Sequence, residues 1–289
     1  MKQLLQTSNA IPVAIEKSSP MIKYDRFGVL PTRQSLWTPE TGKSVCLTAA
    51  QVSAPLAASI ILSDGNDDFL SLRATGPFST VSQNFPSPYQ LKTNNTLMVR
   101  TSDEQIDCQT SGAVTATQTA YNGRTDFTNV NNAVGLHNGS VASLASALLT
   151  QTGGNIVLGY SLLPALAAYL DIEQVVIKFY CRLNLTLAVG ISSMILNWRS
   201  NPQAAWTQLD QISLSIIGTL NYLTNPVEFD ITAAVLGAAN PWDVITTLQT
   251  SFIGSHTGLG IGNTIQLDAV EIEICTTGQN QLTLFGYEV

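Results

Sequence analysis

Apolar and polar residues alternate with a period of two along much of the second half of the chain. The alternating runs are residues 174–182, 183–189, 227–232 and 270–274. Because successive side chains of a strand point to opposite faces, these runs predict antiparallel strands with one buried and one polar face. No long amphipathic helix alternates with them, which disfavours a parallel α/β fold.

The first half of the chain shows shorter apolar runs separated by Gly, Pro and Asn. These runs are residues 44–52, 57–62, 69–73, 96–101 and 112–119. Short strands at this spacing, bounded by turn residues, are typical of a β-sandwich or barrel. Residues 140–149 form the best helix candidate, and 204–209 and 240–248 are expected to be loops or short helices.

These patterns predict an all-β chain, with two β-sandwich or jelly-roll domains that follow an extended N-terminal arm. Residues 1–35 contain Pro12, Pro20 and Pro31 and have no sustained period, so they are assigned to the arm. A small β-sandwich is predicted for 36–121 and a jelly-roll for 126–289. The polar residues 122–126 between them are predicted to be a linker.

Charge is scarce and unevenly distributed. Charged residues make up 11% of the 289 residues, against a usual share of about 25%. A surface of neutral Thr, Ser, Asn and Gln favours large permanent interfaces with other protein, or contact with sugar. The net charge is −7, and residues 126–289 carry 3 basic and 11 acidic residues. An acidic domain of this kind argues against nucleic acid as a partner.

The arm is mildly basic. Its candidate anchoring residues are Lys17, Lys23, Arg26 and Arg33. Two interpretations stay open: a solvated tail, or an arm that lies on an acidic protein surface.

Cysteine spacing and hydropathy argue against a zinc site, a signal peptide and a membrane span. Cys46, Cys108, Cys181 and Cys275 form no C-x-x-C pair, so we expect no zinc site and four buried thiols. The N-terminus lacks a continuous apolar segment typical of a signal peptide, and no run of about 18 apolar residues predicts a membrane span. We therefore expect no membrane insertion.

Catalytic motifs are weak. His137 and His256 are the chain's two imidazoles, and nothing places either in a Ser–His–Asp triad, so both are predicted to be exposed loop residues. Residues 258–262 repeat glycine but lack the strand and helix of a phosphate loop. Paired carboxylates such as Glu271 and Glu273 lie at outward positions of strands, where solvated residues are expected. We therefore predict that the chain is not an enzyme and holds no cofactor or metal.

The segment Asp64–Asp68 opens like a calcium loop. Phe69 then stands where such a loop needs glycine, and Thr75 stands where it needs a bidentate glutamate. An Asp-Gly hairpin turn is the preferred interpretation, and a weakly bound cation is the alternative.

Aromatic residues in the second domain are candidates for glycan contact. They are Trp198, Trp206, Tyr222 and Trp242. Aromatic faces with amide and carboxylate groups nearby suit a pyranose, which has an apolar C–H face and a hydroxyl rim. The competing interpretation is that each ring closes the edge of the sandwich core.

Two stretches resemble modules of tailed-bacteriophage virion proteins. Residues 36–53 resemble a W-T-P-x-T-G-K-x-x-x-L-T-x-x-x-V-S opening of a small β-sandwich. Residues 127–143 resemble a W-x-N-x-x-N-A … D-G-x-Y-A-x pattern that opens a jelly-roll, although Phe127 replaces the Trp. In the stretch that follows, Gln174 replaces a Gly, and the ending Gly286-Tyr287-Glu288-Val289 matches the same set.

This resemblance implies a non-enzymatic protein on the surface of a phage particle, commonly a homotrimer. The leading hypothesis is a tail-spike or tail-fibre component. Its N-terminal part would attach to other virion proteins, and its C-terminal jelly-roll would recognise a host surface polysaccharide. The alternative is a trimeric capsid decoration (cement) protein that stabilises the head shell.

Overall fold

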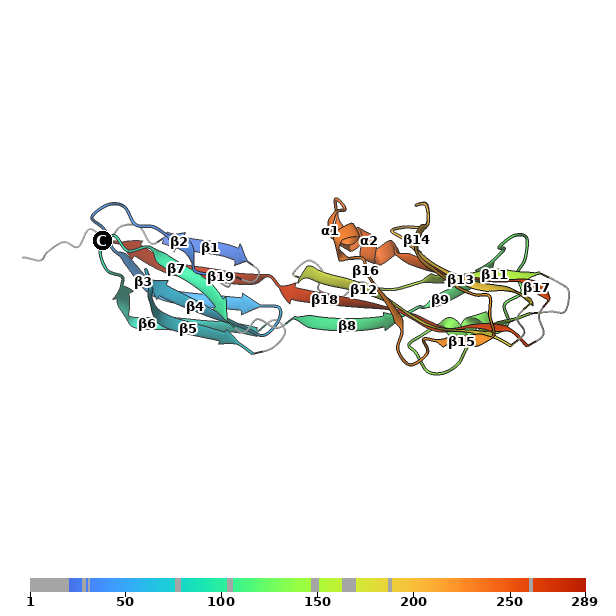
Figure 1. The fold of residues 1–289 in the computed structure, drawn as a ribbon. Helices are drawn as coiled ribbons and strands as arrows, with labels where there is room; N and C mark the ends of the chain where they lie inside the picture. Colours follow the sequence, from blue (N-terminus) through green and yellow to red (C-terminus); the bar gives the residue numbers. More distant parts are fainter. Residues whose placement is uncertain are drawn as a thin grey trace, which may run out of the picture. The chain divides into compact units, whose positions relative to one another are not determined.

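The computed structural model describes residues 21–27, 30, 32–75, 79–102, 106–146, 151–162, 170–186, 189–259 and 262–289. The chain folds into two compact units, and in Figure 1 the first combines blue to green strands with the red C-terminal strand, whereas the second runs from green to red. Unit 1 comprises Met1–Gln105 and Gly278–Val289, and unit 2 comprises Ile106–Thr277. Both are built from β-sheets, which confirms the predicted all-β class.

Unit 1 is a sandwich of two sheets. Sheet I has the strand order β1 (Met21–Phe27), β19 (Asn280–Glu288), β3 (Val45–Ala54), β6 (Ser79–Gln90). Sheet II has the order β2 (Gln34–Trp37), β7 (Leu97–Ser102), β4 (Ala58–Asp64), β5 (Asp67–Ala74). The core between them takes its apolar residues from both sheets, for example Leu47 and Val52 from β3 and Ile60 and Leu62 from β4.

Unit 2 is a second sandwich. Sheet III has the order β10 (Ala142–Ala145), β18 (Thr264–Gly278), β12 (Leu170–Leu185), β15 (Gly218–Asn221), with β16 (Val227–Asp230) on β12 and β8 (Asp107–Gly112) on β18. Sheet IV has the order β14 (Thr207–Leu214), β13 (Val189–Arg199), β17 (Gln249–Leu259), β11 (Thr152–Gly159), β9 (Thr115–Thr119). The strand pairs whose register is defined are antiparallel in both sheets.

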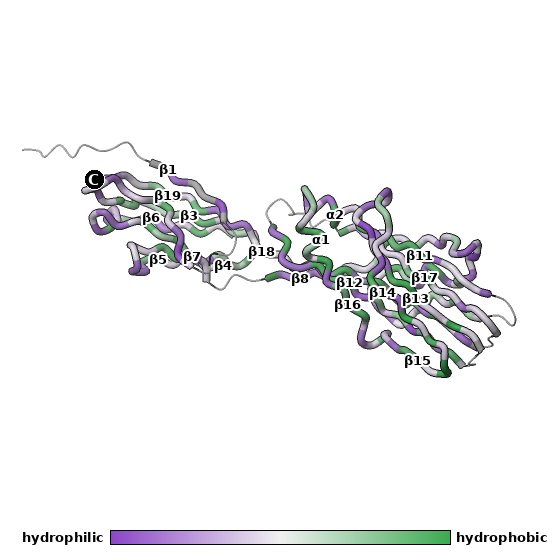
Figure 2. Tube along the Cα trace, turned by 45° about the horizontal axis from the view of Figure 1, so that its top comes forward, coloured by the Kyte–Doolittle hydropathy of each residue, from purple (hydrophilic) through white to green (hydrophobic). Residues whose placement is uncertain are grey.

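The alternation seen in the sequence builds the core of unit 2. Ile177 and Phe179 of β12 and Val270 and Ile272 of β18 are fully buried against β11, β13 and β17. Figure 2 shows hydrophobic and hydrophilic residues alternating along these strands. The helices α1 (Thr232–Leu236) and α2 (Pro241–Thr247) add further core residues, and a 3-10 turn spans Val130–Ala133. No helix among the described residues is long and apolar enough to cross a membrane.

The two units differ from the predicted domain ranges. Residues 21–27, which we assigned to an extended arm, form β1 and pair with β19. The predicted linker 122–126 lies inside unit 2, where Asn122 and Gly123 have positive φ and form a tight turn closed by a Tyr121–Arg124 bridge. A turn and a linker have the same local composition, so the sequence does not distinguish them.

The helix predicted for 140–149 is wrong in its described part. Ala142–Ala145 form β10, whose residues pair with Ile265 and its neighbours on β18. Ala and Leu favour a helix, but pairing with a distant strand overrides this weak local preference. Residues 147–149 lie outside the described residues.

The cysteines form one disulfide, which the sequence did not predict. Cys108 and Cys275 are direct partners in the β8–β18 register and are bonded to each other. Strand pairing between residues 167 positions apart could not be read from their spacing. Cys46 and Cys181 are buried free thiols, as predicted, and burial raises the pKa of Cys181 to about 12.

Candidate functional site

The four aromatic residues predicted as glycan contacts all lie in unit 2 but do not share one exposed surface. Trp198 on β13 is 7% exposed and belongs to the core. Tyr222 and Trp242 are half-buried and pack against that core, and the Trp242 indole N–H donates to the Leu170 carbonyl oxygen over 3.3 Å. Trp206 differs from them, because the Arg199 guanidinium lies 4.2 Å above its ring.

The predicted anchoring residues that the structure describes contact unit 1 itself. Lys17 lies outside the described residues. Lys23 and Arg26 lie on β1, and the Lys23 ammonium is 5.6 Å from the centroid of the Trp37 ring. Arg33 forms an ion pair with Asp68 at 2.9 Å. Lys23 and Arg33 therefore contribute to the packing of unit 1.

The Asp64–Asp68 segment is the hairpin turn between β4 and β5, with Gly65 at a φ of 61°. Asp64 is buried and accepts hydrogen bonds from the Lys92 backbone N–H and the Asn95 side chain. Hydrogen bonds from Arg100, Ser63 and Arg33 hold the pKa of Asp68 well below its usual range. The Asp64 and Asp68 carboxylates therefore stabilise the turn through these hydrogen bonds. Among the described residues, no group of three or more His, Cys, Asp or Glu residues is arranged to hold a metal.

The two histidines have different environments. His256 lies on β17, is 1% exposed, and its Nδ1 is 2.8 Å from the Ser192 hydroxyl. The prediction of an exposed loop is wrong for His256, because its small neighbours Ser255 and Thr257 gave no apolar pattern. His137 is exposed, as predicted, stacks on Tyr180, and its Nδ1 lies 3.0 Å from a carboxylate oxygen of Asp268. In the described structure neither imidazole joins both a hydroxyl and a carboxylate, as a nucleophilic triad requires.

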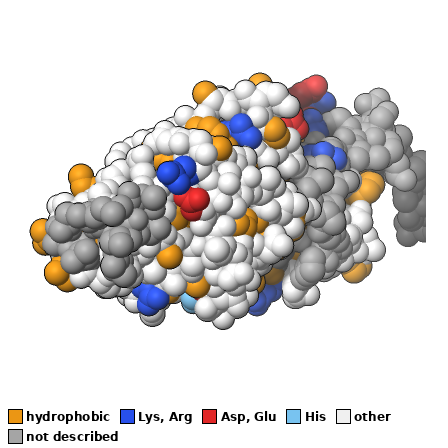
Figure 3. Space-filling model, turned by 90° about the vertical axis from the view of Figure 1, so that its right-hand side faces the viewer, with side chains coloured by type: hydrophobic (Ala, Val, Ile, Leu, Met, Phe, Trp, Pro, Cys, Tyr) orange, Lys and Arg blue, Asp and Glu red, His pale blue; other side chains and the backbone are white. Residues whose placement is uncertain are grey.

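Charge is divided unequally between the two sheets of unit 2. The strands of sheet III carry eight acidic and two basic residues, which are Asp107, Asp171, Glu173, Glu228, Asp230, Asp268, Glu271, Glu273, Lys178 and Arg182. The strands of sheet IV carry one of each, Asp210 and Arg199. Figure 3 shows one side of the molecule, on which Lys, Arg, Asp and Glu side chains are scattered among neutral ones. Sheet IV is therefore a nearly neutral surface in an acidic unit.

Part of the acidic charge of sheet III is buried rather than solvated. Glu271 is 7% exposed and accepts a hydrogen bond from the His137 backbone N–H. Asp268 is 1% exposed and accepts from the backbone N–H groups of Asn138 and Gly139. The expectation that outward carboxylates are solvated is wrong for Glu271, which is buried and bonded to the backbone of His137.

The outer face of sheet IV follows from its register. Met194, Leu196 and Trp198 point into the core, so the residues between them on β13 point outward. One row across the five strands is Thr119, Asn155, Ile253, Ile195, Gln211. The next row is Thr117, Val157, Ser251, Asn197, Gln208. The face thus combines hydroxyl and amide groups with a strip of aliphatic side chains.

A chain of hydrogen bonds fixes the amide of Asn155 on this face. Its Nδ2 donates to the Thr119 hydroxyl over 3.0 Å, and its Oδ1 accepts from the Ser251 hydroxyl over 2.7 Å. Asn197 in turn donates to Ser251 over 3.4 Å. Ser251 and Asn197 are buried, whereas Thr119 is exposed and Asn155 half-buried. The inner pair therefore orients the outer pair, which a partner molecule can reach.

Arg199 and Trp206 close one end of the face. The Arg199 Nε donates to the Gln249 side-chain oxygen over 2.9 Å, while its guanidinium covers the Trp206 ring. The Thr247 hydroxyl donates to the Ser200 carbonyl oxygen over 2.8 Å, which ties α2 to the same corner. A guanidinium held in this way is stabilised by the ring and is partly shielded.

Sequence reasoning selected Trp206 but missed the rest of this face. Asn155, Asn197 and Ser251 are far apart in the chain, and only strand order brings them together. One local signal was present: Thr115, Thr117 and Thr119 alternate along a single strand. Such spacing indicates a polar strand face, but it does not show which strands continue that face.

Comparisons with known proteins return no matching family model and no matching curated protein. Solved structures of low similarity do match. The CBM22-1–CBM22-2 tandem domain of Paenibacillus barcinonensis Xyn10C is 11% identical over 91% of this chain and 95% of its own, with a TM-score of 0.26. A chain of infectious bursal disease virus, Gx strain, is 10% identical over 94% and 77%, with a TM-score of 0.20. A structure of carbohydrate-binding modules from the β-sandwich superfamily is 11% identical over 88% and 98%, with a TM-score of 0.17. These values assign the chain to no family.

Proposed function

We propose that the chain is a non-enzymatic structural protein of a virus particle, of the tail-spike or tail-fibre type. In this proposal its N-terminal part attaches to the particle, and unit 2 recognises a glycan on the host surface. The observation that carries the proposal is the outer face of sheet IV. This face presents oriented hydroxyl and amide groups and almost no charge.

Glycan recognition depends on polar groups that are already in position before the ligand arrives. Fixing a side chain on binding costs free energy, so a pre-oriented amide binds better than a free one. Asn155 is held by Thr119 and Ser251, and therefore loses little freedom when a sugar hydroxyl approaches. The aliphatic strip of Ile253 and Ile195 beside it matches the apolar face of a sugar ring.

Cell binding and particle imaging test this function together. The intact chain should bind susceptible host cells, and Asn155→Ala combined with Trp206→Ala should reduce that binding at least tenfold. Thr219→Ala, an exposed substitution on sheet III, is the matched control and should bind normally. Absence of binding to any susceptible host, or imaging that finds the protein off the particle, would contradict the proposal.

A capsid decoration protein is the second candidate. Its specific support is the same low charge of sheet IV, because permanent interfaces between copies are poor in charged residues. Copy number separates the two: hundreds of copies in each particle favour a decoration protein, and tens favour a tail component.

A further inference from the structure

We infer that the outer face of sheet IV selects an uncharged, extended polysaccharide and discriminates against sialylated, sulfated or uronic-acid chains. This inference rests on the proposed glycan recognition and narrows its ligand class. It is carried by the distribution of charge between the sheets and by the state of Arg199.

An anionic sugar would need a free cation on the face. Carboxylate and sulfate groups are held in proteins mainly by Arg and Lys. Arg199 is the basic residue of the sheet IV strands; its Nε and one Nη donate to the Gln249 side-chain oxygen and its guanidinium lies against the Trp206 ring, so only part of its donor capacity remains for an anion. The rest of unit 2 adds Arg124, Lys178 and Arg182 against eleven acidic residues, so its overall field repels anions.

Neutral hydroxyl groups, by contrast, match what the face offers. A sugar hydroxyl both donates and accepts hydrogen bonds, as do threonine hydroxyls and glutamine amides. Thr117, Thr119, Gln208 and Gln211 are exposed at the two edges of the face. The Asn155 amide has a second N–H beyond the one that Thr119 accepts.

The arrangement favours an extended chain that crosses the strands. The polar edges belong to β9 and β14, and the half-buried Val157, Ile253 and Ile195 lie between them. Neighbouring strands are about 4.8 Å apart, so five strands span roughly 19 Å. A linear oligosaccharide lying across the sheet would place hydroxyl groups at both edges and C–H faces over the aliphatic strip.

A glycan array probes this selectivity with the intact chain. The probes are immobilised neutral glucans, mannans and galactans, next to sialylated, sulfated and uronic-acid oligosaccharides. We expect signal on neutral probes alone, and less than a twofold change in that signal between about 0.05 M and about 0.5 M salt, because no ion pair is involved. Asn155→Ala and Trp206→Ala should each lower the signal at least fivefold, whereas Thr219→Ala should not.

The outcomes separate this inference from the function on which it rests. Salt-sensitive binding to anionic probes would overturn the selectivity and leave glycan recognition standing. Binding to no glycan would overturn both. Light scattering and the glycan array on an Asn155→Arg variant give a third test. If this substitution breaks an oligomer but leaves array binding unaffected, the face is an interface between copies of the chain. The inference would then be wrong.

Discussion

At the scale of single residues, burial decides what each aromatic side chain does. Trp198 and Trp206 lie eight positions apart and have the same chemistry, but β13 turns the first into the core, whereas the second lies against Arg199 on the outer face. The sequence predicted glycan contact for both, because residue type does not reveal which ring is buried. The two rings should therefore respond differently to removal.

Trp198→Ala should lower the free energy of unfolding of unit 2 by about 3–5 kcal/mol, the usual cost of emptying a buried aromatic site. Trp206→Ala should cost less than about 1.5 kcal/mol, since it removes a partly exposed ring and its contact with one guanidinium. Urea denaturation monitored by circular dichroism measures the loss of stability in each variant. Equal losses for the two variants would contradict the assignment of Trp198 to the core.

His256 makes the stability of unit 2 dependent on pH. Burial lowers its pKa, so in acid the unfolded chain binds a proton that the folded chain does not. The free energy of unfolding should therefore be level above the unfolded-state pKa of about 6.5 and should fall as the pH drops below it. Denaturant titrations between about pH 8 and pH 5 measure this dependence.

His256→Gln should flatten the dependence of the free energy of unfolding on pH, because glutamine does not titrate. This result is expected whether or not the substitution changes stability at neutral pH. His137→Gln is the matched control and should keep the acid-induced loss. If the His256 variant and the unaltered chain lose stability in parallel as the pH falls, the buried imidazole is not its source.

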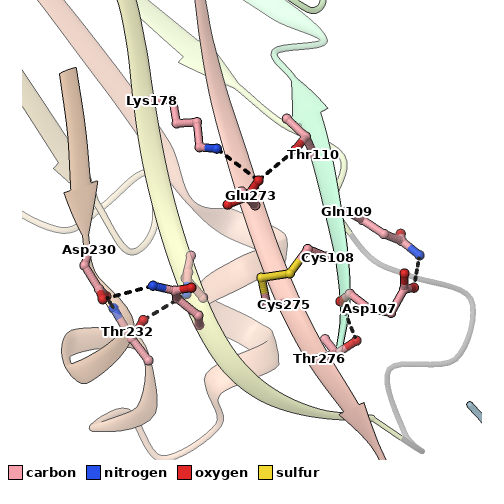
Figure 4. The surroundings of a disulfide bond; sticks show 12 residues. Asp107, Cys108, Gln109, Thr110, Lys178, Asp230, Thr232, Glu273, Cys275 and Thr276 are labelled. Atoms are coloured by element: carbon pink, nitrogen blue, oxygen red, sulfur yellow. Dashed lines mark hydrogen bonds and ion pairs between the residues drawn. A yellow bond between two sulfur atoms is a disulfide. The ribbon is translucent and has the colours of Figure 1, made fainter. Parts of the chain in front are cut away.

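At the scale of elements, a disulfide fixes an edge strand where the chain passes between units. Cys108 and Cys275 lie within two residues of the boundaries of unit 2 at Ile106 and Thr277. Figure 4 shows the bond joining β8 to β18, with Glu273 held by Lys178 and Thr110 farther along. The bond therefore secures β8 at the end where the chain enters the unit.

Removing the bond should loosen β8 selectively. In a Cys108→Ser and Cys275→Ser double variant, amide hydrogens of residues 107–112 should exchange at least tenfold faster, and stability should fall by about 2–4 kcal/mol. Reduction of the unaltered chain should give the same exchange pattern, whereas Cys46→Ala, at a free thiol of unit 1, should leave β8 unchanged. Unaltered exchange in β8 after reduction would show that its backbone pairing suffices without the bond.

Local patterns predicted much of the fold at this scale. The alternation from Val175 to Cys181 specified which face of β12 is buried, since period two allows no other arrangement of these residues. The sequence divided 174–182 from 183–189, and this division is wrong: β12 continues past residue 182 to Leu185, and the next strand, β13, begins at Val189. Strand pairing was beyond local reasoning: β10 and the disulfide both depend on β18, more than a hundred residues away. The same limit hid most of the sheet IV face.

At the scale of the whole molecule, the net charge resides in one unit. Unit 1 carries nine basic and nine acidic residues, whereas unit 2 carries four basic and eleven acidic ones, the entire net charge of −7. Within unit 2 the acidic residues gather on sheet III. Because of this asymmetry, a neutral partner of unit 2 would cover the fewest charged groups if it bound sheet IV.

We propose a homotrimer, which the resemblance to phage virion proteins implies and with which the low overall charge agrees. Light scattering at micromolar concentration should give three times the chain mass of 30.9 kDa, and dissociation should require denaturant. A monomer under these conditions would count against both virion functions, because each needs permanent association between copies.

In the proposed function, the outer face of sheet IV, and not that of sheet III, meets the partner. Hydroxyl-radical footprinting of the intact chain, free and bound to an immobilised host polysaccharide, tests it most directly. We expect binding to protect Trp206, Ile195 and Ile253 from oxidation and to leave Tyr180, on the outer face of sheet III, unchanged. Protection of Tyr180 with continued oxidation of Trp206 and Ile253 would contradict the account.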